Sequence, residues 1–357
     1  MKNPIHFIVI IGIYLFLNGC KEDYYTVEDF NSVKKIDTHT HLNAPNAALA
    51  EQAKEDNFKI LAVNVDISGE YPPLSKQFEY ATIQQKKFPE QVEKLTAFTL
   101  NNWNSPNWEA ETIAKLKADF ANGALGIKIW KNIGLSYRDS SKQLIMVDNP
   151  RFDKVIEYII SQDKTVMGHL GEPKNCWLPL DSMTVNNDRN YFKENPKYHM
   201  YLHPEFPSYE VQIKARDNFI GRHPKMRFVG AHLGSLEWSV DELALRLEKY
   251  PNMAVDLAER ICHLQHQSIK NYKKIRDFMI KYQDRIIYGT DVHIDENKVA
   301  SSAKKELHDK WTKDWKYFVT DEKITDERVN GTFVGLKLPK SVVNKIVHDN
   351  AVTWFKM

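Results

Sequence analysis

Two histidines spaced two residues apart are the first candidates for chemistry. They lie in the run Asp37-Thr38-His39-Thr40-His41. Side chains on a β-strand alternate between its faces, so His39 and His41 would project the same way and could bind one metal ion together. Asp37 would share their face, where it either orients a ligand ring or has a packing role. Because such a pair is a weak signal alone, the prediction depends on finding further ligands.

Three residues elsewhere in the chain provide those ligands. His169, His232 and Asp291 each close a short run with strand-like composition. Imidazole and carboxylate groups that converge at one place suit Zn²⁺ or a similar divalent ion. The question is therefore which fold would bring these strand ends together.

Eight strand-like runs alternate with longer helix-like segments, and this alternation predicts parallel strand–helix units. The predicted strands are 35–41, 59–67, 94–100, 126–130, 164–169, 227–232, 252–257 and 285–291. Eight units favour an α/β fold of the closed (β/α)₈ TIM-barrel type. No glycine-rich phosphate loop follows the first strand, which argues against a dinucleotide-binding fold. The strand ends of such a barrel meet at one mouth, where active sites lie.

Two connections are long enough to cover that mouth. One follows the fifth predicted strand, runs from 172 to about 207 and is rich in aromatic residues; the other follows the eighth strand, from 292 to about 339. Long connections inside a compact domain usually have a function. We predict that the first closes over the mouth and that His199 and His203 contact the substrate from it.

The set of strand-end residues is similar to that of a known family. His39 and His41 on strand one, His169 on strand five, His232 on strand six and Asp291 on strand eight together resemble the amidohydrolase superfamily. The runs 289–291 (Gly-Thr-Asp) and 348–351 (His-Asp-Asn-Ala) look like its amidohydrolase 2 branch, which includes lactone and amide hydrolases and metal-dependent decarboxylases. The resemblance extends from about 35 to 355.

This resemblance implies a role for each residue. His39, His41, His169 and Asp291 would be metal ligands, and Asp291 and His232 would be the catalytic residues. A carboxylate such as Asp291 can accept a proton from water and later deliver it to a leaving group. His232 can orient the water or polarise the substrate oxygen.

The predicted activity is metal-dependent hydrolysis of a lactone, ester or amide bond in a small molecule. A metal-dependent decarboxylase on the same scaffold is the alternative, and a non-catalytic ligand-binding lipoprotein is the second alternative. Zn²⁺ is the favoured metal, with one ion preferred over two. Hydrolysis and decarboxylation differ in their products, and the non-catalytic protein differs from both in needing no metal.

Three charged residues are predicted to bind substrate. Lys128 would point into the barrel, where its ordinary cationic form repels a second metal ion, whereas binuclear members of the superfamily carry a carboxylated lysine at this place. Glu172 resembles the glutamate of a His-x-Gly-Glu motif in adenosine-type deaminases, although a turn residue is the alternative. Arg260 follows the seventh strand and either binds a carboxylate with two parallel hydrogen bonds or forms a surface ion pair.

The first residues have the pattern of a secretion signal. Lys2 precedes an apolar run over 7–17, which ends in Leu17-Asn18-Gly19-Cys20 and resembles the lipobox of bacterial lipoproteins. We expect a signal peptide over 1–19, lipidation of Cys20, a tether over 20–32 and a barrel over 33–357, with an uncleaved membrane anchor as the alternative. The protein would then be lipid-anchored in the cell envelope, in the periplasm or at the outer membrane, and residues 21–23 resemble a surface-export signal.

Composition restricts the partners. The chain has 357 residues and a formal net charge of +2 from 49 basic and 47 acidic residues. Such a balance gives no large field of one sign and therefore argues against nucleic acid. The expected partners are a small-molecule substrate and, through the N-terminal lipid, a membrane; homo-oligomerisation is left open.

Overall fold

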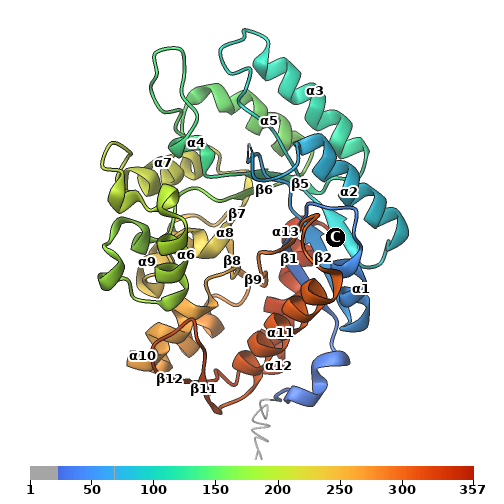
Figure 1. Cartoon of the computed structure of the whole chain (residues 1–357), viewed down its shortest axis with the longest axis vertical. Helices are drawn as coiled ribbons and strands as arrows, with labels where there is room; N and C mark the ends of the chain where they lie inside the picture. Colours follow the sequence, from blue (N-terminus) through green and yellow to red (C-terminus); the bar gives the residue numbers. More distant parts are fainter. Residues whose placement is uncertain (1–22, 68) are drawn as a thin grey trace, which may run out of the picture.

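A computed structural model describes residues 23–67 and 69–357 (Figure 1). The predicted signal peptide over 1–19 and the predicted lipidation of Cys20 lie outside the described residues. Among the residues that are described, no helix combines the length and the apolar character needed to cross a membrane.

Parallel strands form the closed barrel that the sequence predicts. β3 and β4 are two halves of the third barrel strand, joined through Leu95, whose N–H donates to the oxygen of Ala62 at 2.8 Å. β9 and β10 are likewise parts of the eighth. The strands are β1 (Lys35–Leu42), β2 (Phe58–Ala62), β3 (Val92–Lys94), β4 (Thr96–Ala97), β5 (Gly126–Ile129), β6 (Thr165–Gly168), β7 (Arg227–Gly230), β8 (Met253–Asp256), β9 (Ile286–Ile287) and β10 (Val292–Ile294).

The eighth strand returns to the first and closes the barrel. β10 pairs with β1 in parallel, the N–H of Thr38 donates to the oxygen of Tyr288 at 3.0 Å, and the N–H of Asp291 donates to the oxygen of His39 at 2.7 Å. The remaining strands follow one another in sequence order from β1 to β9. The predicted (β/α)₈ fold is therefore confirmed.

Helices surround the strands on the outside, as Figure 1 shows. Their apolar residues pack with the outward side chains of the strands in one large core. This helical layer contains α1 (Ala48–Glu55), α2 (Leu74–Lys87), α3 (Trp108–Ala121), α5 (Asp153–Ser161), α7 (Tyr209–Arg222), α9 (Val240–Lys249), α10 (Ile261–Lys281) and α11 (Ala300–Val319).

The barrel interior is apolar towards one end and polar towards the other. Inward side chains such as Met167 and Val229 form a second core with Trp354 and Phe355, which belong to the terminal segment α12 (Lys340–Asn344), η7 (Lys345–Asp349) and α13 (Asn350–Phe355). The end of the chain thus plugs the bottom of the barrel. The mouth at the opposite end is left for polar residues.

The long connection after β6 is a folded insert. It contains η3 (Lys174–Trp177), η4 (Leu180–Ser182), α6 (Asn186–Glu194), η5 (Pro196–Tyr198) and η6 (Met200–Leu202). Its apolar side chains form a small core of their own, which includes Cys176, Phe192 and Met200. The connection after β10 contains α11 and the antiparallel hairpin β11 (Lys323–Thr325) and β12 (Thr332–Val334).

The predicted tether over 20–32 is packed against the barrel where the structure describes it. Residues 27–31 form the 3₁₀-helix η1 (Val27–Asn31). Phe30 is 6% exposed, and its ring lies 6.1 Å from the rings of both Phe58 and Trp315. The charged composition of this segment predicted a loose tether, but the segment contains one buried apolar side chain, Phe30. Residues 23–32 therefore belong to the folded domain.

Removing the ring of Phe30 should destabilise the protein. We expect Phe30→Ala to lower the free energy of unfolding by about 3 kcal/mol, because the buried ring would leave a cavity that its neighbours fill only in part. Urea unfolding followed by circular dichroism measures the change. Val27→Ala is the control, since Val27 lies in the same helix and is 39% exposed. Equal stability of both variants would contradict a structural role for residues 23–32.

Candidate metal centre and active site

A β-bulge in β1 places its two histidines in the mouth. The register between β1 and β2 shifts between Asp37 and Thr40, so strict alternation of faces is broken there. His39 and His41 remain two residues apart and both point into the barrel, where their rings lie 5.4 Å apart. The predicted pair is therefore brought together.

The same bulge turns Asp37 away from the histidine rings. Its carboxylate accepts hydrogen bonds from the Thr290 hydroxyl (2.6 Å) and from the indole of Trp311 in α11 (2.9 Å). Burial raises the pKa of Asp37 to about 6, against these hydrogen bonds. Of the two roles considered, orienting a ligand ring is wrong, and Asp37 ties the first strand to the eighth and to α11.

Left-handed backbone brings the residues after β7 and β9 into the mouth. His232 has φ 59° and belongs to α8 (Ala231–Gly234), and Asp291, between β9 and β10, has φ 67°. This conformation costs a residue with a side chain roughly 1–2 kcal/mol. At His232 the cost is offset in part by its N–H, which donates to Asp256 Oδ1 at 2.6 Å.

Each of three imidazoles uses its outer nitrogen for a hydrogen bond to the scaffold. Nδ1 of His41 donates to the oxygen of Val63 at 2.7 Å, and Nδ1 of His232 donates to the oxygen of Ala258 at 2.9 Å. Nδ1 of His39 lies 2.8 Å from Asp256 Oδ2. Since carbonyl and carboxylate oxygens only accept, these contacts place the proton on Nδ1 and leave Nε2 as a lone pair.

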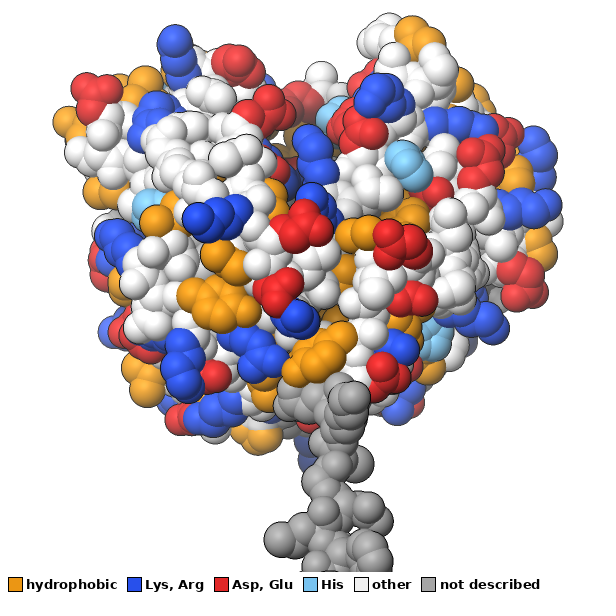
Figure 2. All heavy atoms as spheres, turned by 90° about the horizontal axis from the view of Figure 1, so that it is seen from below, with side chains coloured by type: hydrophobic (Ala, Val, Ile, Leu, Met, Phe, Trp, Pro, Cys, Tyr) orange, Lys and Arg blue, Asp and Glu red, His pale blue; other side chains and the backbone are white. Residues whose placement is uncertain are grey.

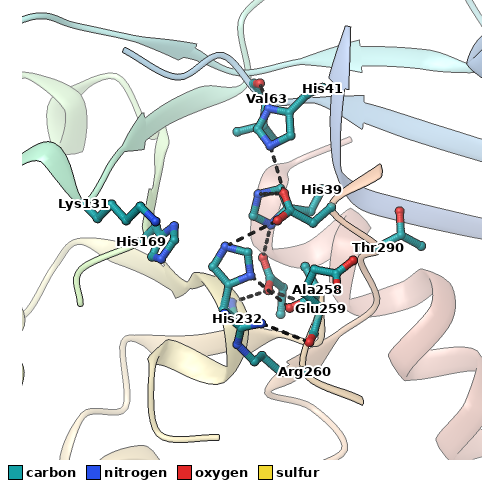
Figure 3. Close-up of polar contacts among 12 residues, drawn as sticks. His39, His41, Val63, Lys131, His169, His232, Ala258, Glu259, Arg260 and Thr290 are labelled. Atoms are coloured by element: carbon teal, nitrogen blue, oxygen red, sulfur yellow. Dashed lines mark hydrogen bonds and ion pairs between the residues drawn. The ribbon is translucent and has the colours of Figure 1, made fainter. Parts of the chain in front are cut away.

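The inner nitrogens converge on the carboxylate of Asp291. Its Oδ1 lies 2.9 Å from Nε2 of His41 and 3.2 Å from Nε2 of His39, and its Oδ2 lies 4.0 Å from Nε2 of His232. Figure 3 shows the rings of His41, His39 and His232 following one another through the site, with His169 to one side. The donors come from the first, sixth and eighth barrel strands.

Burial keeps these groups in the protonation states that a metal requires. Burial lowers the pKa of His39, and well below its ordinary value those of His169 and His232, so the three rings are neutral at pH 7. Burial also raises the pKa of Asp291, yet that pKa lies well below its usual range, so the carboxylate is ionised. Neutral imidazoles face an ionised carboxylate.

This arrangement fits a cation. The lone pairs on Nε2 of His39 and His41 lie 3.2 and 2.9 Å from an ionised oxygen of Asp291, and none of these atoms carries a proton to share. Among the described residues, the donor atoms of His39, His41 and Asp291 all lie within 4.8 Å of one another, as do those of His39, His232 and Asp256. A divalent ion held by the first group would resolve the repulsion.

His169 is the predicted ligand that stands furthest from this group. Its ring lies 4.3 Å from that of His232, and its buried Nε2 has no hydrogen-bond partner among the described residues. Glu172 Oε2 is 3.5 Å from that nitrogen. A buried unpartnered imidazole nitrogen at the mouth is consistent with a ligand, and this role stays a prediction.

The cavity at the mouth has a volume of about 310 Å³ and contains most of the predicted substrate-binding residues. Lys128 on β5 reaches Nε2 of His39 with its Nζ at 3.1 Å, and burial lowers the pKa of Lys128 to about 8 against the opposing charges of Asp256 and Asp291. Glu172 and Arg260 also line this cavity. These three predicted residues are therefore at the site.

The two loop histidines are not at the site, and their predicted substrate contact is wrong in this structure. His199 is buried, and its Nε2 lies 2.8 Å from the oxygen of Leu178 inside the insert. Nε2 of His203 lies 3.1 Å from the oxygen of Pro196. Both rings satisfy the backbone of the insert itself, and the insert reaches the cavity with Tyr191, Phe192 and Tyr198 instead.

Sequence analysis missed several charged residues of the site, among them Asp256 and Lys131. Asp256, at the end of β8, is fully buried and is the carboxylate that orients His39. Its position near the end of the predicted strand 252–257 could have identified it by the same rule that identified Asp291. Lys131 lines the cavity and pairs with Glu172. It lies just beyond the fourth predicted strand.

A parallel barrel with imidazole and carboxylate donors at its mouth is the architecture of metal-dependent hydrolases and lyases. A family model described as Amidohydrolase matches residues 36–357. The chain therefore belongs to the amidohydrolase family, as the strand-end residues predicted.

Solved structures resemble this chain in fold. An uncharacterized TIM-barrel protein from Bordetella bronchiseptica is 14% identical, with 91% of this chain and 100% of that chain covered and a TM-score of 0.53. A 2,6-dihydroxybenzoate decarboxylase from Rhizobium is 14% identical (90% and 98% covered, TM-score 0.48), and a dihydroorotase from Campylobacter jejuni is 9% identical (91% and 83% covered, TM-score 0.46). The search among curated proteins found no significant match.

Proposed function

We propose that this protein is a metal-dependent hydrolase that cleaves a lactone, ester or amide bond of a small molecule. The observation that supports it most is the convergence of the inner nitrogens of His39 and His41 on Asp291, 3.2 and 2.9 Å from the same oxygen. His39, His41, His169 and Asp291 would hold one divalent ion, with Zn²⁺ favoured. When bound, such an ion lowers the pKa of water from 15.7 to about 7 and polarises a substrate oxygen.

The chain's own residues supply the proton transfers. Asp291 is ionised and turned into the cavity, so its Oδ2 can take a proton from the attacking water and pass it to the leaving group. His232 is fixed by Ala258 with Nε2 facing the cavity, where it can accept a hydrogen bond from that water and orient it. The Lys128 ammonium can stabilise negative charge on the substrate oxygen.

Decarboxylation is the second candidate, and one observation favours it. Lys128, Lys131 and Arg260 all line the cavity, so that a substrate carboxylate would meet three cations. A decarboxylase would release CO₂, whereas a hydrolase incorporates oxygen from water.

Metal removal and product analysis test the proposal together. Purified protein should contain about one equivalent of divalent metal, lose turnover on treatment with a chelator and regain it with Zn²⁺. The substrate panel would contain lactones, aryl esters, amides and aromatic acids. Incorporation of ¹⁸O from labelled water into the product identifies hydrolysis, and released CO₂ identifies the second candidate. Full turnover by metal-free protein would contradict both.

We further propose that the chain is a lipoprotein of the cell envelope, attached through Cys20 and located in the periplasm or at the outer membrane. The lipobox-like run before Cys20 supports this proposal. Radiolabelled palmitate incorporation that is lost in Cys20→Ser would test it. The partners proposed are a small-molecule substrate and the membrane, without nucleic acid.

A further inference from the structure

The cavity contains a buried cation whose hydrogen-bond donors are largely unused. Arg260, at the start of α10, is 9% exposed. Its Nη1 donates to the backbone oxygen of Glu259 at 3.1 Å, and its Nε has no hydrogen-bond partner among the described residues. A guanidinium has five donors, and leaving them unpaired in a buried place costs free energy.

Among the described residues, no carboxylate forms a close ion pair with Arg260. Asp188, on α6, is its one acidic partner within 4.0 Å among the described residues, and Asp188 Oδ1 stands 3.9 Å from Nη1. The other oxygen of Asp188 accepts from Asn175 Nδ2 at 2.8 Å and lies 3.0 Å from Nε2 of His263. These contacts hold Asp188 by the oxygen that faces away from Arg260. Asp188 therefore compensates the charge of Arg260 without occupying the hydrogen-bond donors of the guanidinium.

The other two cations of the cavity already have contacts there. Lys131 forms an ion pair with Glu172, and Lys128 contacts the imidazole of His39. Arg260 thus has the most spare donors of the three. Figure 3 places it beside His232, on the side away from His41, and so next to the predicted reaction centre.

We propose that the substrate carries a carboxylate, which Arg260 binds next to His232. This inference rests on the proposed function, because it takes the cavity to be the substrate site. The planar guanidinium fork matches a carboxylate with two parallel hydrogen bonds. A monoanion fits better than a phosphate dianion, since Glu172, Asp188 and Glu259 line the same cavity and repel negative charge.

The size and the lining of the cavity indicate what the rest of the substrate is like. Its volume of about 310 Å³ is at the lower end of small-molecule sites. Trp130, Tyr191, Phe192 and Tyr198 line it, and aromatic walls of this kind suit a ring or another flat apolar body. The substrate class is therefore a small carboxylic acid, with its cleavable bond directed towards Asp291.

Binding of matched probes tests this without turnover. Benzoate and benzamide have nearly the same size and differ in charge, and their binding to the Zn²⁺-loaded full-length protein can be measured by isothermal titration calorimetry. We expect benzoate to bind at least about tenfold more tightly, because hydrogen bonds to a charged group are the stronger ones. Arg260→Gln should remove most of this difference, and Arg138→Gln, at an exposed arginine, should leave it unchanged.

Several outcomes would overturn the proposal. Equal affinities of benzoate and benzamide for the unaltered protein would do so, as would a benzoate preference that Arg260→Gln does not reduce, since the carboxylate would then be bound elsewhere. Phenylphosphonate that binds more tightly than benzoate through Arg260 would overturn the choice of carboxylate. If Arg260→Gln does not fold, Arg260→Lys must show reduced discrimination.

These measurements separate the substrate class from the reaction. A protein that needs metal and hydrolyses neutral esters equally well with Arg260→Gln would keep the proposed function and lose the carboxylate. A protein that binds benzoate through Arg260 but has no metal-dependent turnover would keep the carboxylate site and lose the proposed function.

Discussion

Asp291→Asn should lower kcat by about 10³-fold or more, with the fold retained. Asparagine keeps the shape of the side chain but cannot take a proton from water, and positioned acid–base groups contribute about 10²–10⁴-fold to a rate. It is also the substitution best suited to the backbone, because Asp291 has φ 67° and asparagine tolerates the left-handed region. Steady-state kinetics on a substrate found by the panel, with circular dichroism, would measure both effects.

Asp284→Asn is the matched control for this variant, since Asp284 pairs with Lys345 at the surface. Its kcat should equal that of the unaltered protein. Full activity of Asp291→Asn would exclude Asp291 as the proton acceptor, whereas equal losses in both variants would point to an unspecific effect.

Asp256→Asn should weaken zinc binding by about 10- to 100-fold, the usual effect of removing a group that orients a ligand. Asp256 Oδ1 accepts from the N–H of His232 (2.6 Å) and from that of Ala258 (3.1 Å). An asparagine oxygen would take that place and would turn its NH₂ towards Nδ1 of His39. Two donors cannot face each other, so the proton of His39 would move to Nε2 and block the nitrogen that is directed at the metal.

Competition with a chromophoric chelator would give the zinc affinity of this variant. Asp314→Asn is the control, because Asp314 is equally buried and bonds the Tyr288 hydroxyl (2.9 Å) outside the cavity. We expect Asp314→Asn to change stability more than zinc affinity. Unaltered zinc binding in Asp256→Asn would show that the tautomer of His39 does not depend on this carboxylate.

The fold could be predicted because its signal is local and repeated. Each of the eight predicted runs overlaps a barrel strand, and the residues that close three of those runs, His169, His232 and Asp291, meet at the mouth. A strand end is a sequence feature, and barrel geometry turns strand ends into neighbours. This explains why residues so far apart in the chain could be assigned to one site.

Features that depend on tertiary structure could not be predicted in the same way. The bulge in β1 reverses the face of Asp37, and alternation alone gives no sign of it. His199 and His203 turn to backbone oxygens of their own insert, contacts that depend on how the insert folds. Asp256 also lies near the end of a predicted strand. Sequence analysis did not select it, because a single aspartate in an apolar run gives no further sign of a function.

The packing of residues 23–32 determines how the molecule would stand on a membrane. η1 adjoins Lys35, the first residue of β1, whose ammonium donates to the oxygen of Phe30, and the first residues of parallel strands lie at the end of a barrel opposite to its mouth. Figure 2 shows the described chain beginning at the lower edge, whereas the surface is hollowed at the upper edge. If the proposed lipid attaches the chain from this side, the barrel would point its opening away from the bilayer, and substrates would arrive from the aqueous phase without passing along the lipid surface.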